Sequence, residues 1–380
     1  MRRALELAER SVGETSPNPM VGCVIVRDGR IVGEGYHKKP GLPHAEVEAL
    51  RQAGSQARGA DLYVNLEPCC HYGRTPPCTE AIIEGTIRRV VAATGDPNPK
   101  VAGGGFAALR QAGIEVEVGL LEDEARALNE AYFHRLRHGR PFVTLKWAMT
   151  LDGKVAGPGG ETARLSGEEA LRRVHEERRR HDAIMVGVGT VLTDDPELTV
   201  RHVPGRSPRR IVVDARLDTP PGARVLSPGV PTLILTTEDA DQKRARHLEE
   251  KGARVLRLPA SGTRVDVRKA LSLLADDGVS TLLVEGGPTL HGTFMDLGLA
   301  DRLLVDVASR VIGTRDAPSA VMGEGARKGP LAVGFTIVRV DDLAGDVVIE
   351  ARPRGGEAPV HRHREDEGPA VGTLADIDGS

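Results

Sequence analysis

The chain has 380 residues, a length that favours two domains. Hydrophobic residues make up 40% of it and aromatic residues only 3%, so we expect sizeable cores built mainly from Leu, Val, Ile and Ala. With 51 basic and 54 acidic side chains, the formal charge of −3 argues against a protein that binds nucleic acid or a membrane surface through bulk charge.

Strands and helices alternate along the first part of the chain. The expected elements are helix 3–12, two strands within 21–37, helix 44–54, strand 61–67, helix 79–85, strand 88–95, helix 105–113 and strand 114–119. Asp28-Gly29 forms the tight turn between the first two strands. A single amphipathic helix over 121–139 follows, because Gly139 can cap it and Pro141 stops it.

The second part of the chain begins with a strand at 142–151 and a turn at Asp152-Gly153. A helix at 166–181 follows, and then come strands at 182–189, 210–214, 232–237, 253–258, 281–286 and 302–308, with helices between several of them. Alternation of this kind predicts a layered α/β structure in both parts.

We place the first domain at residues 1–122, a connecting helix at 123–140 and the second domain at 141–352. Residues 353–380 have no aromatic side chain and many Gly, Pro and charged residues, which predicts a disordered tail. The beginning of the chain lacks the apolar stretch of a signal peptide, and no run approaches 18 apolar residues. We therefore expect a cytoplasmic protein without a membrane span.

The cysteines are confined to the beginning of the chain, at Cys23, Cys69, Cys70 and Cys78. This distribution favours local metal chemistry in a reducing compartment over a disulfide framework. Cys23 lies within a predicted strand and is interpreted as a buried thiol. Cys70 adjoins a candidate metal ligand, and we expect it to point away from the metal.

The segments LPHAEVEAL at 42–50 and EPCCHYGRTPPC at 67–78 carry the clearest chemical signal. They offer His44, Cys69 and Cys78 as zinc ligands, and three protein ligands leave the fourth tetrahedral position to water, as in a catalytic site. Glu46 follows the histidine by two residues and can shuttle protons without binding the metal. The order His-x-Glu, Pro-Cys, Cys is the signature of zinc deaminases.

The predicted helices support this chemistry, because His44 and Cys78 each stand where a helix is expected to begin. The positive end of a helix favours a thiolate over a thiol. Zinc lowers the pKa of its bound water, and Glu46 can pass the proton to a departing amine. The predicted reaction is hydrolytic removal of an amino group from an aromatic heterocycle. His71 is a rival ligand that we interpret as a substrate-pocket residue.

Two glycine motifs in the second part are compatible with nucleotide binding. Gly187-Val-Gly189 follows a strand, but Leu192 stands where a dinucleotide-binding fingerprint has its third glycine. In the segment 285–289, EGGPT, a strand ends in two glycines, and proline opens a helix whose N-terminus attracts phosphate. A plain strand-to-helix turn is an equally good interpretation of that segment.

Several segments resemble the bifunctional riboflavin-biosynthesis protein family, in which a diaminohydroxyphosphoribosylaminopyrimidine deaminase is fused to a 5-amino-6-(5-phosphoribosylamino)uracil reductase. They are CHYGRTPP between the ligand cysteines, PNP at 17–19, GDPNPKVAGGG at 95–105, TLKWAMTLDGKVA at 144–156, VGVGTVLTDDPELTVR at 186–201 and LLVEGGPTLHGTF at 282–294. The resemblance covers about residues 3–352. It implies a cytidine-deaminase-like α/β/α domain followed by a dihydrofolate-reductase-like α/β domain.

The resemblance also implies zinc and NADPH as cofactors, a small-molecule pyrimidine ribosyl phosphate as substrate, no nucleic-acid partner and a homo-oligomer. It assigns catalysis to Glu46 and Asp194. The implied NADPH-binding residues are Ala148, Arg164, Thr190, Asp194, Gly287, Pro288, Thr289, Leu290, His291, Gly292 and Thr293. The implied substrate-binding residues are Asn18 in the deaminase and Thr162, Arg178, Leu198, Arg201 and Glu285 in the reductase. Guanidinium groups suit a substrate phosphate, because they can donate two parallel hydrogen bonds to it.

One position departs from that family. Its members usually carry Ser-x-Trp-Ile-Thr/Ser after the Leu-Asp-Gly turn, and the tryptophan packs on the cofactor. Here the segment 162–166 is TARLS, so Arg164 replaces the tryptophan. An arginine at this position can stack on the adenine or meet a phosphate instead.

Two other interpretations stay open at this point. A cytidine or tRNA-adenosine deaminase would share the zinc signature, but the near-neutral charge, the few aromatic residues and the reductase-like second part speak against a nucleic-acid substrate. A binding protein with a structural zinc would have no use for Glu46, which is not a ligand.

Overall fold

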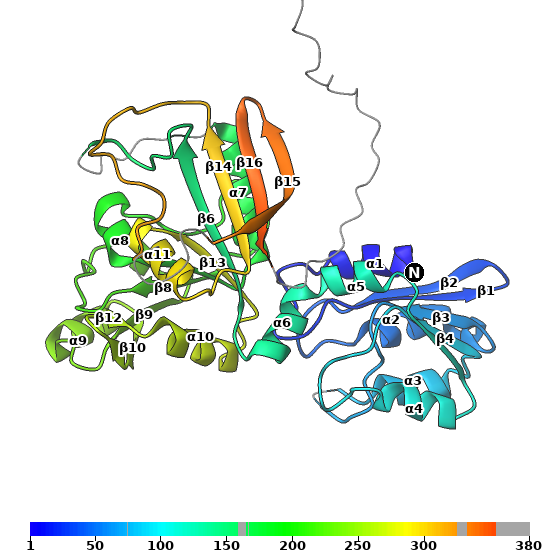
Figure 1. The fold of residues 1–380 in the computed structure, drawn as a ribbon. Helices are drawn as coiled ribbons and strands as arrows, with labels where there is room; N and C mark the ends of the chain where they lie inside the picture. Colours follow the sequence, from blue (N-terminus) through cyan, green and yellow to red (C-terminus); the bar gives the residue numbers. More distant parts are fainter. Residues whose placement is uncertain (74, 159–164, 166, 325–332, 355–380) are drawn as a thin grey trace, which may run out of the picture.

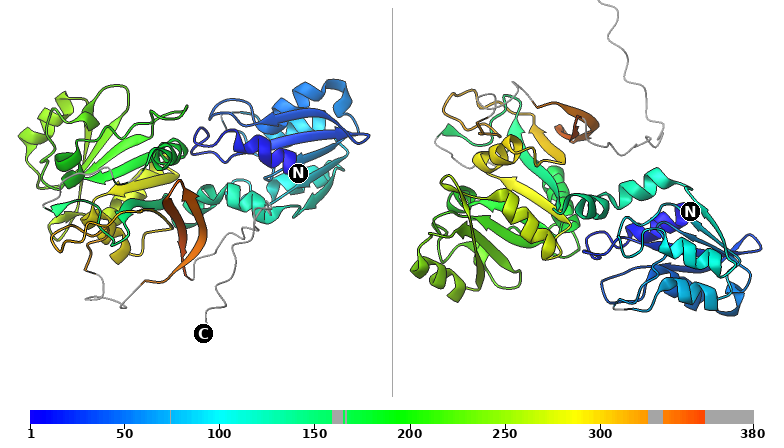
Figure 2. Two further views of the ribbon diagram at one scale, coloured as in Figure 1. Left: turned by 90° about the horizontal axis from the view of Figure 1, so that it is seen from above. Right: turned by 60° about the horizontal axis from the view of Figure 1, so that its bottom comes forward.

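The computed structural model describes residues 1–380 except 74, 159–164, 166, 325–332 and 355–380. In the described part, the chain folds into two α/β lobes that lie side by side and are connected by two short helices (Figure 1, Figure 2). Each lobe has one main sheet and its own hydrophobic core, which confirms the predicted α/β class. None of the described helices combines the length and the apolarity that crossing a bilayer requires.

The N-terminal lobe has a five-stranded sheet in the order β2-β1-β3-β4-β5. Its strands are β1 (Gly22–Arg27), β2 (Arg30–Tyr36), β3 (Asp61–Val64), β4 (Arg89–Ala92) and β5 (Glu115–Val118), and its helices are α1 (Arg2–Glu9), α2 (Ala45–Ala53), α3 (Cys78–Glu84) and α4 (Gly104–Gln111). β1 is antiparallel to β2 and β3, whereas β3, β4 and β5 run parallel because a helix crosses over between successive strands. The elements predicted for this lobe are confirmed.

Helix α2 lies against strand β2 at backbone contact distance. A Cβ atom at Gly35 would lie 2.2 Å from the carbonyl oxygen of Ala45, and one at Gly33 would lie 2.2 Å from that of Ala49. No side chain fits in either place, so the alternate glycines of β2 are what allow the helix to sit so close. The amino end of α2, where the predicted metal site begins, is thereby held at a fixed depth.

The C-terminal lobe has a nine-stranded sheet in the order β10-β9-β8-β7-β13-β6-β14-β16-β15. Its strands are β6 (Phe142–Thr150), β7 (Ala183–Gly187), β8 (Arg209–Val213), β9 (Thr232–Thr237), β10 (Ala253–Leu258), β13 (Thr281–Gly286), β14 (Arg302–Ala308), β15 (Phe335–Leu343) and β16 (Asp346–Pro353). The helices are α7 (Glu168–Arg180), α8 (Val188–Asp194), α9 (Gln242–Glu250), α10 (Val267–Asp276) and α11 (Pro288–Asp296), and a small hairpin consists of β11 (Ala260–Ser261) and β12 (Arg264–Val265). In this spatial order, neighbouring strands from β10 to β14 are parallel. β16 is antiparallel to β14, and β15 is antiparallel to β16.

The single helix predicted over 121–139 was wrong, because the structure has two helices there. They are α5 (Glu122–Leu128) and α6 (Glu130–His138), and they are separated at Asn129. The side-chain oxygen of Asn129 accepts from the backbone N–H of Met20 at 2.8 Å, and its amide donates to the carbonyl of Met20 at 2.9 Å. This contact between distant segments fixes the break.

Three further differences concern the C-terminal lobe. The strand predicted at 182–189 ends at Gly187, where α8 begins. The hairpin of β15 and β16 was not predicted, because β15 lacks a regular buried face. The predicted tail starts one residue too early, since Pro353 belongs to β16, and residues 355–380 lie outside the described part.

The N-terminal lobe meets the second sheet at the amino ends of its parallel strands. Arg206, just before β8, donates to the carbonyl of Gly13 and pairs with Asp182, just before β7, at 2.9 Å. A Cβ atom on Gly278, just before β13, would lie 3.7 Å from Pro17. The carboxyl ends of the same strands lie at the opposite edge of the sheet.

Candidate functional site

The three predicted metal ligands converge in the N-terminal lobe. His44 immediately precedes α2, Cys69 follows β3, and Cys78 is the first residue of α3. Their ligand atoms all lie within 4.8 Å of one another. Nδ1 of His44 is 3.1 Å from Sγ of Cys78 and 3.5 Å from Sγ of Cys69. One imidazole nitrogen and two sulfurs are a donor set suited to zinc in a catalytic site.

The two sulfurs differ in pKa. Hydrogen bonds from Cys78 and from His44 lower the pKa of Cys69 to about 4 against the opposing effect of burial. The hydrogen bond to Cys69, together with burial, raises the pKa of Cys78 well above its usual range. Without a metal, Cys69 is the sulfur more readily deprotonated, and a divalent cation would favour the thiolate form of both.

Glu46 lies in the first turn of α2, and only 3% of it is exposed. Burial, followed by the charge on Cys69, raises the pKa of its carboxyl. Oxygen Oε2 is buried and has no hydrogen-bond partner in the described structure. Because a buried carboxylate oxygen without a partner costs free energy, this one is suited to exchange a proton with a molecule in the adjoining cavity, which Glu46 lines.

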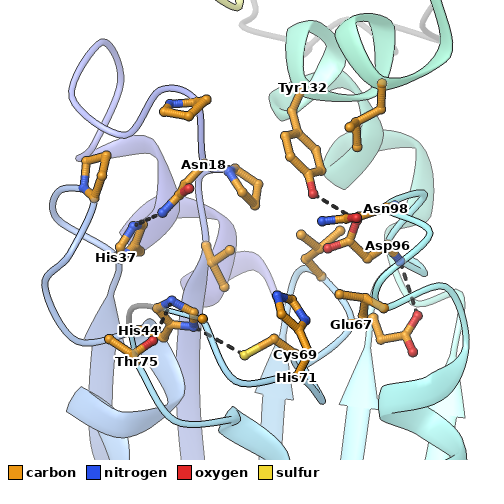
Figure 3. A pocket seen from close by; sticks show the side chains of 18 of the residues that line it. Asn18, His37, His44, Glu67, Cys69, His71, Thr75, Asp96, Asn98 and Tyr132 are labelled. Atoms are coloured by element: carbon orange, nitrogen blue, oxygen red, sulfur yellow. Dashed lines mark hydrogen bonds between the residues drawn. The ribbon is translucent and has the colours of Figure 1, made fainter. Parts of the chain in front are cut away.

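A cavity of 380 Å³ adjoins these residues, and every lining residue lies between Pro17 and Leu136 (Figure 3). Asn18 and His71, which the sequence suggested as substrate-pocket residues, both line it. Cys70 does not belong to the metal cluster, since its thiol donates to the carbonyl of Lys100 at 3.8 Å. The cavity has the size and polarity of a small-molecule site.

Three polar residues of this cavity were missed by sequence reasoning. Nε2 of His37 lies 3.0 Å from the side-chain nitrogen of Asn18, and across the cavity the hydroxyl of Tyr132 donates to Asp96 at 2.9 Å (Figure 3). Tyr132 comes from α6, which the sequence presented only as a connection between domains. The GDPNPK segment that holds Asp96 was noticed as a family motif, but nothing in the sequence paired it with a tyrosine 36 residues later.

Glu67 lies between the metal site and one wall of the cavity. The sequence analysis did not identify it as a site residue. It is 4% exposed and stands two residues before Cys69. Its carboxylate accepts four backbone N–H groups, from Asp96 at 3.2 Å, Gly103 at 3.0 Å, Gly105 at 2.9 Å and Phe106 at 3.2 Å. The loop held in this way carries Asp96 and Asn98 into the cavity. Glu67 therefore positions one wall of the cavity relative to the cysteine ligand.

In the C-terminal lobe, predicted site residues gather at the carboxyl ends of neighbouring strands. Ala148 lies near the end of β6, Thr190 and Asp194 belong to α8 directly after β7, and Gly287 precedes α11 directly after β13. A Cβ atom on Gly287 would lie 3.2 Å from the hydroxyl of Thr190. The start of α8 and the start of α11 therefore face each other, as two walls of a phosphate-binding crevice would.

Arg178 and Glu285, both predicted to contact substrate, form a largely buried bidentate ion pair. Nε and one terminal nitrogen of Arg178 donate to the two carboxylate oxygens at 2.9 and 2.7 Å, and the other donates to the carbonyl of Thr199 at 3.1 Å. Burial opposes ionisation of Glu285, but Arg178 outweighs it and the pKa is lowered. Arg201 pairs with Glu197 at 2.6 Å, and 45% of its side chain is exposed.

Part of the segment 287–293, which was predicted to bind NADPH, is packed against other residues of the protein. The ring nitrogens of His291 lie 3.2 and 3.3 Å from two backbone carbonyls, and the side chain is buried. A Cβ atom on Gly292 would collide with the backbone of the loop that follows β14. Thr162 and Arg164 lie outside the described residues, so their predicted contacts stay predictions.

Comparison with known proteins agrees with both lobes. A family model for the cytidine and deoxycytidylate deaminase zinc-binding region matches residues 1–94, and one for the RibD C-terminal domain matches residues 141–349. Riboflavin biosynthesis protein RibD of Aquifex aeolicus is 48% identical over 315 residues, which cover 82% of this chain and 87% of that protein. The Escherichia coli protein of the same name is 41% identical over 363 residues, covering 92% and 97%.

Solved structures give the same result over nearly the whole chain. RibD of Acinetobacter baumannii superposes with a TM-score of 0.83 at 37% identity, covering 93% of this chain and 97% of that one. A diaminohydroxyphosphoribosylaminopyrimidine deaminase/5-amino-6-(5-phosphoribosylamino)uracil reductase of Thermotoga maritima gives 0.81 at 36% identity with the same coverage. Fold and site thus define a zinc-deaminase lobe fused to a reductase lobe. The chain belongs to the RibD family of riboflavin biosynthesis proteins.

Replacing Glu67 by Gln tests the role of its carboxylate. An amide nitrogen would face backbone N–H donors, so we expect the free energy of unfolding of the N-terminal lobe to fall by about 2–3 kcal/mol and ammonia release to fall with it. Denaturant titration and an ammonia assay measure the two effects. Glu84→Gln, at the exposed end of α3, is the matched control and should change stability by no more than about 0.5 kcal/mol. Equal stability of the two variants would contradict the assigned role.

Proposed function

We propose that this chain catalyses two successive steps of riboflavin biosynthesis. The first is zinc-dependent hydrolytic deamination of 2,5-diamino-6-(5-phosphoribosylamino)pyrimidin-4-one. The second is NADPH-dependent reduction of the ribosyl group, which gives 5-amino-6-(5-phosphoribitylamino)uracil. The observation that carries the proposal is the convergence of His44, Cys69 and Cys78 beside the unpartnered carboxylate oxygen of Glu46, in a chain of the RibD family.

In the deaminase, His44, Cys69 and Cys78 would hold zinc, which when bound supplies an acidified water molecule. Glu46 takes a proton at Oε2 and returns it to the amino group that leaves. Its burial and raised pKa suit this exchange, because a buried carboxyl accepts a proton more readily than an exposed one does. Asn18 and the Asp96–Tyr132 pair offer the donors and acceptors that orient a polar pyrimidine ring.

In the reductase, NADPH would be held by Ala148, Thr190, Asp194 and those residues of the run 287–293 that are not packed against protein, and when bound it would supply a hydride for C1 of the opened ribose. The two arginines predicted to contact substrate have different roles. Each side-chain nitrogen of Arg178 donates to a protein oxygen, and the ion pair orients Glu285. Arg201 is half-exposed, so its guanidinium is better placed to reach the substrate phosphate.

We further propose that the enzyme works in the cytoplasm as a homo-oligomer and takes no nucleic-acid substrate. The near-neutral charge supports the last point. The confinement of the cysteines to the deaminase lobe, where two of them belong to a candidate metal site, supports a reducing compartment.

A coupled assay tests the two activities together. The diaminopyrimidinone phosphate is offered to the purified enzyme with and without NADPH, and the products are followed by mass spectrometry. We expect the deaminated ribosylamino compound alone without NADPH and the ribityl compound with it. A zinc chelator should stop the first step while added deaminated intermediate is still reduced. Ammonia release from cytidine or RNA only would overturn the proposal.

Glu46→Gln isolates the proton transfer. The variant keeps the shape of the side chain but cannot take a proton, so we expect it to retain stoichiometric zinc and lose about 10²–10⁴-fold in deamination rate. Elemental analysis and ammonia release are the measurements. Glu48→Gln, two residues further along α2 and paired with Arg51, is the control and should keep its activity. Full activity of Glu46→Gln would remove the mechanism.

Asp194→Asn addresses the second lobe. Asp194 ends α8 at the carboxyl edge of the sheet, where a carboxylate can accept from the hydroxyls of a bound nucleotide or substrate. We expect NADPH oxidation to fall by at least about 10-fold, the equivalent of one lost hydrogen bond to a charged group, while deamination survives. Asp276→Asn, on the exposed end of α10, serves as control. An unchanged oxidation rate would contradict the role of Asp194.

A further inference from the structure

The segment 198–202 carries Arg201, and it lies between α8 and β8 without belonging to a helix or a strand. It is nevertheless closely held. Leu198 is 2% exposed and has a positive φ of 55°. The backbone N–H of Val200 donates to the hydroxyl of Ser207 at 3.0 Å. A segment of this kind keeps one conformation only through contacts with its neighbours.

Helix α7 supplies two of these contacts from adjacent turns. Arg178 donates to the carbonyl of Thr199 at 3.1 Å, and Nδ1 of His175 accepts the backbone N–H of Arg201 at 3.0 Å. His175 and Arg178 are three residues apart, so they share one face of the helix. The same face therefore holds Glu285 through Arg178 and the backbone of Arg201 through His175.

The imidazole of His175 is neutral and accepts a hydrogen bond. Only 1% of it is exposed, and burial together with the charges of Arg178, His202 and Arg201 lowers its pKa to about 4. Because Nδ1 accepts from a backbone N–H, the ring proton resides on Nε2. That nitrogen is buried and has no hydrogen-bond partner in the described structure. An apolar side chain would avoid the cost of this unpaired donor, so the imidazole contributes chiefly through the acceptor at Nδ1.

We propose that His175 is a positioning residue of the reductase, which fixes the backbone of Arg201 and so directs its guanidinium towards the substrate phosphate. The inference rests on the proposed function and adds a residue to it. Without the acceptor, the backbone N–H of Arg201 loses its partner on α7. The guanidinium still donates to Glu197 and Thr199, each at 2.6 Å, but the backbone position from which it extends is no longer fixed. Glu285 keeps its own partner in Arg178, so the reducing step itself is untouched.

The test compares His175→Leu, which removes the acceptor, with His175→Asn, whose side-chain oxygen can occupy the place of Nδ1. For His175→Leu we expect KM for 5-amino-6-(5-phosphoribosylamino)uracil to rise about 10-fold, with kcat within about twofold of the wild type. His175→Asn should recover most of the loss. Calorimetric binding of the same compound to the NADPH-free protein should follow KM. His202→Leu removes the neighbouring ring, 4.5 Å away, but not the acceptor, and should leave KM unchanged.

A double-mutant cycle shows whether His175 acts through Arg201. In an Arg201→Ala background, His175→Leu should raise KM no further, because the guanidinium that it directs is already gone. An additive effect of the two changes, an unchanged KM in His175→Leu, or an equal loss in His175→Asn would each overturn the inference. So would a parallel fall in kcat, NADPH affinity and deamination, since that marks general misfolding. Failure of the proposed function looks different, because the wild type would then not oxidise NADPH with this substrate at all.

Discussion

The geometry of the first active site depends on how closely α2 lies on β2. Two glycines in alternate positions of the strand let the backbone of the helix come within contact distance, and a methyl group at either would push the helix outwards. His44 and Glu46 move with that helix, whereas the two sulfurs come from other elements. Because metal–ligand distances tolerate only about 0.2 Å, the glycines of β2 are as important for the site as the ligands themselves.

Three glutamates with little exposure, Glu46, Glu67 and Glu285, have different partners. Glu67 accepts four backbone N–H groups, and Glu285 is bound by both arms of a guanidinium. In both, each carboxylate oxygen accepts at least one hydrogen bond from protein. Glu46 alone of the three keeps a buried oxygen without a partner, and it is the one that faces the metal cluster. Among these three side chains, the unpartnered oxygen thus marks the carboxylate that is suited to proton transfer.

Much of the fold and the metal cluster could be predicted from the sequence, because both depend on local patterns. Strand and helix periodicity gave the order of elements in each lobe, and the spacing of His44, Glu46, Cys69 and Cys78 indicated the deaminase chemistry. Features that depend on distant contacts could not be predicted. The helix is interrupted at Asn129, whose side chain hydrogen-bonds to the backbone of Met20. Tyr132 lines the cavity because α6 lies beside it. His175 is a further case, since its function depends on an amide 26 residues away.

The placement of the two lobes decides how the intermediate travels. The wall of the deaminase cavity around Pro17 abuts Gly278, at the amino edge of the second sheet, whereas the residues that would bind NADPH stand beyond the carboxyl ends of the same strands. A deaminated pyrimidine has to pass round the sheet, a path of at least roughly 17–20 Å for strands of this length. Within a single chain the deaminase cavity and the predicted NADPH-binding residues therefore do not adjoin each other. Covalent fusion of the lobes keeps the two activities in equal amounts, but it does not bring the two sites together at one edge of the sheet.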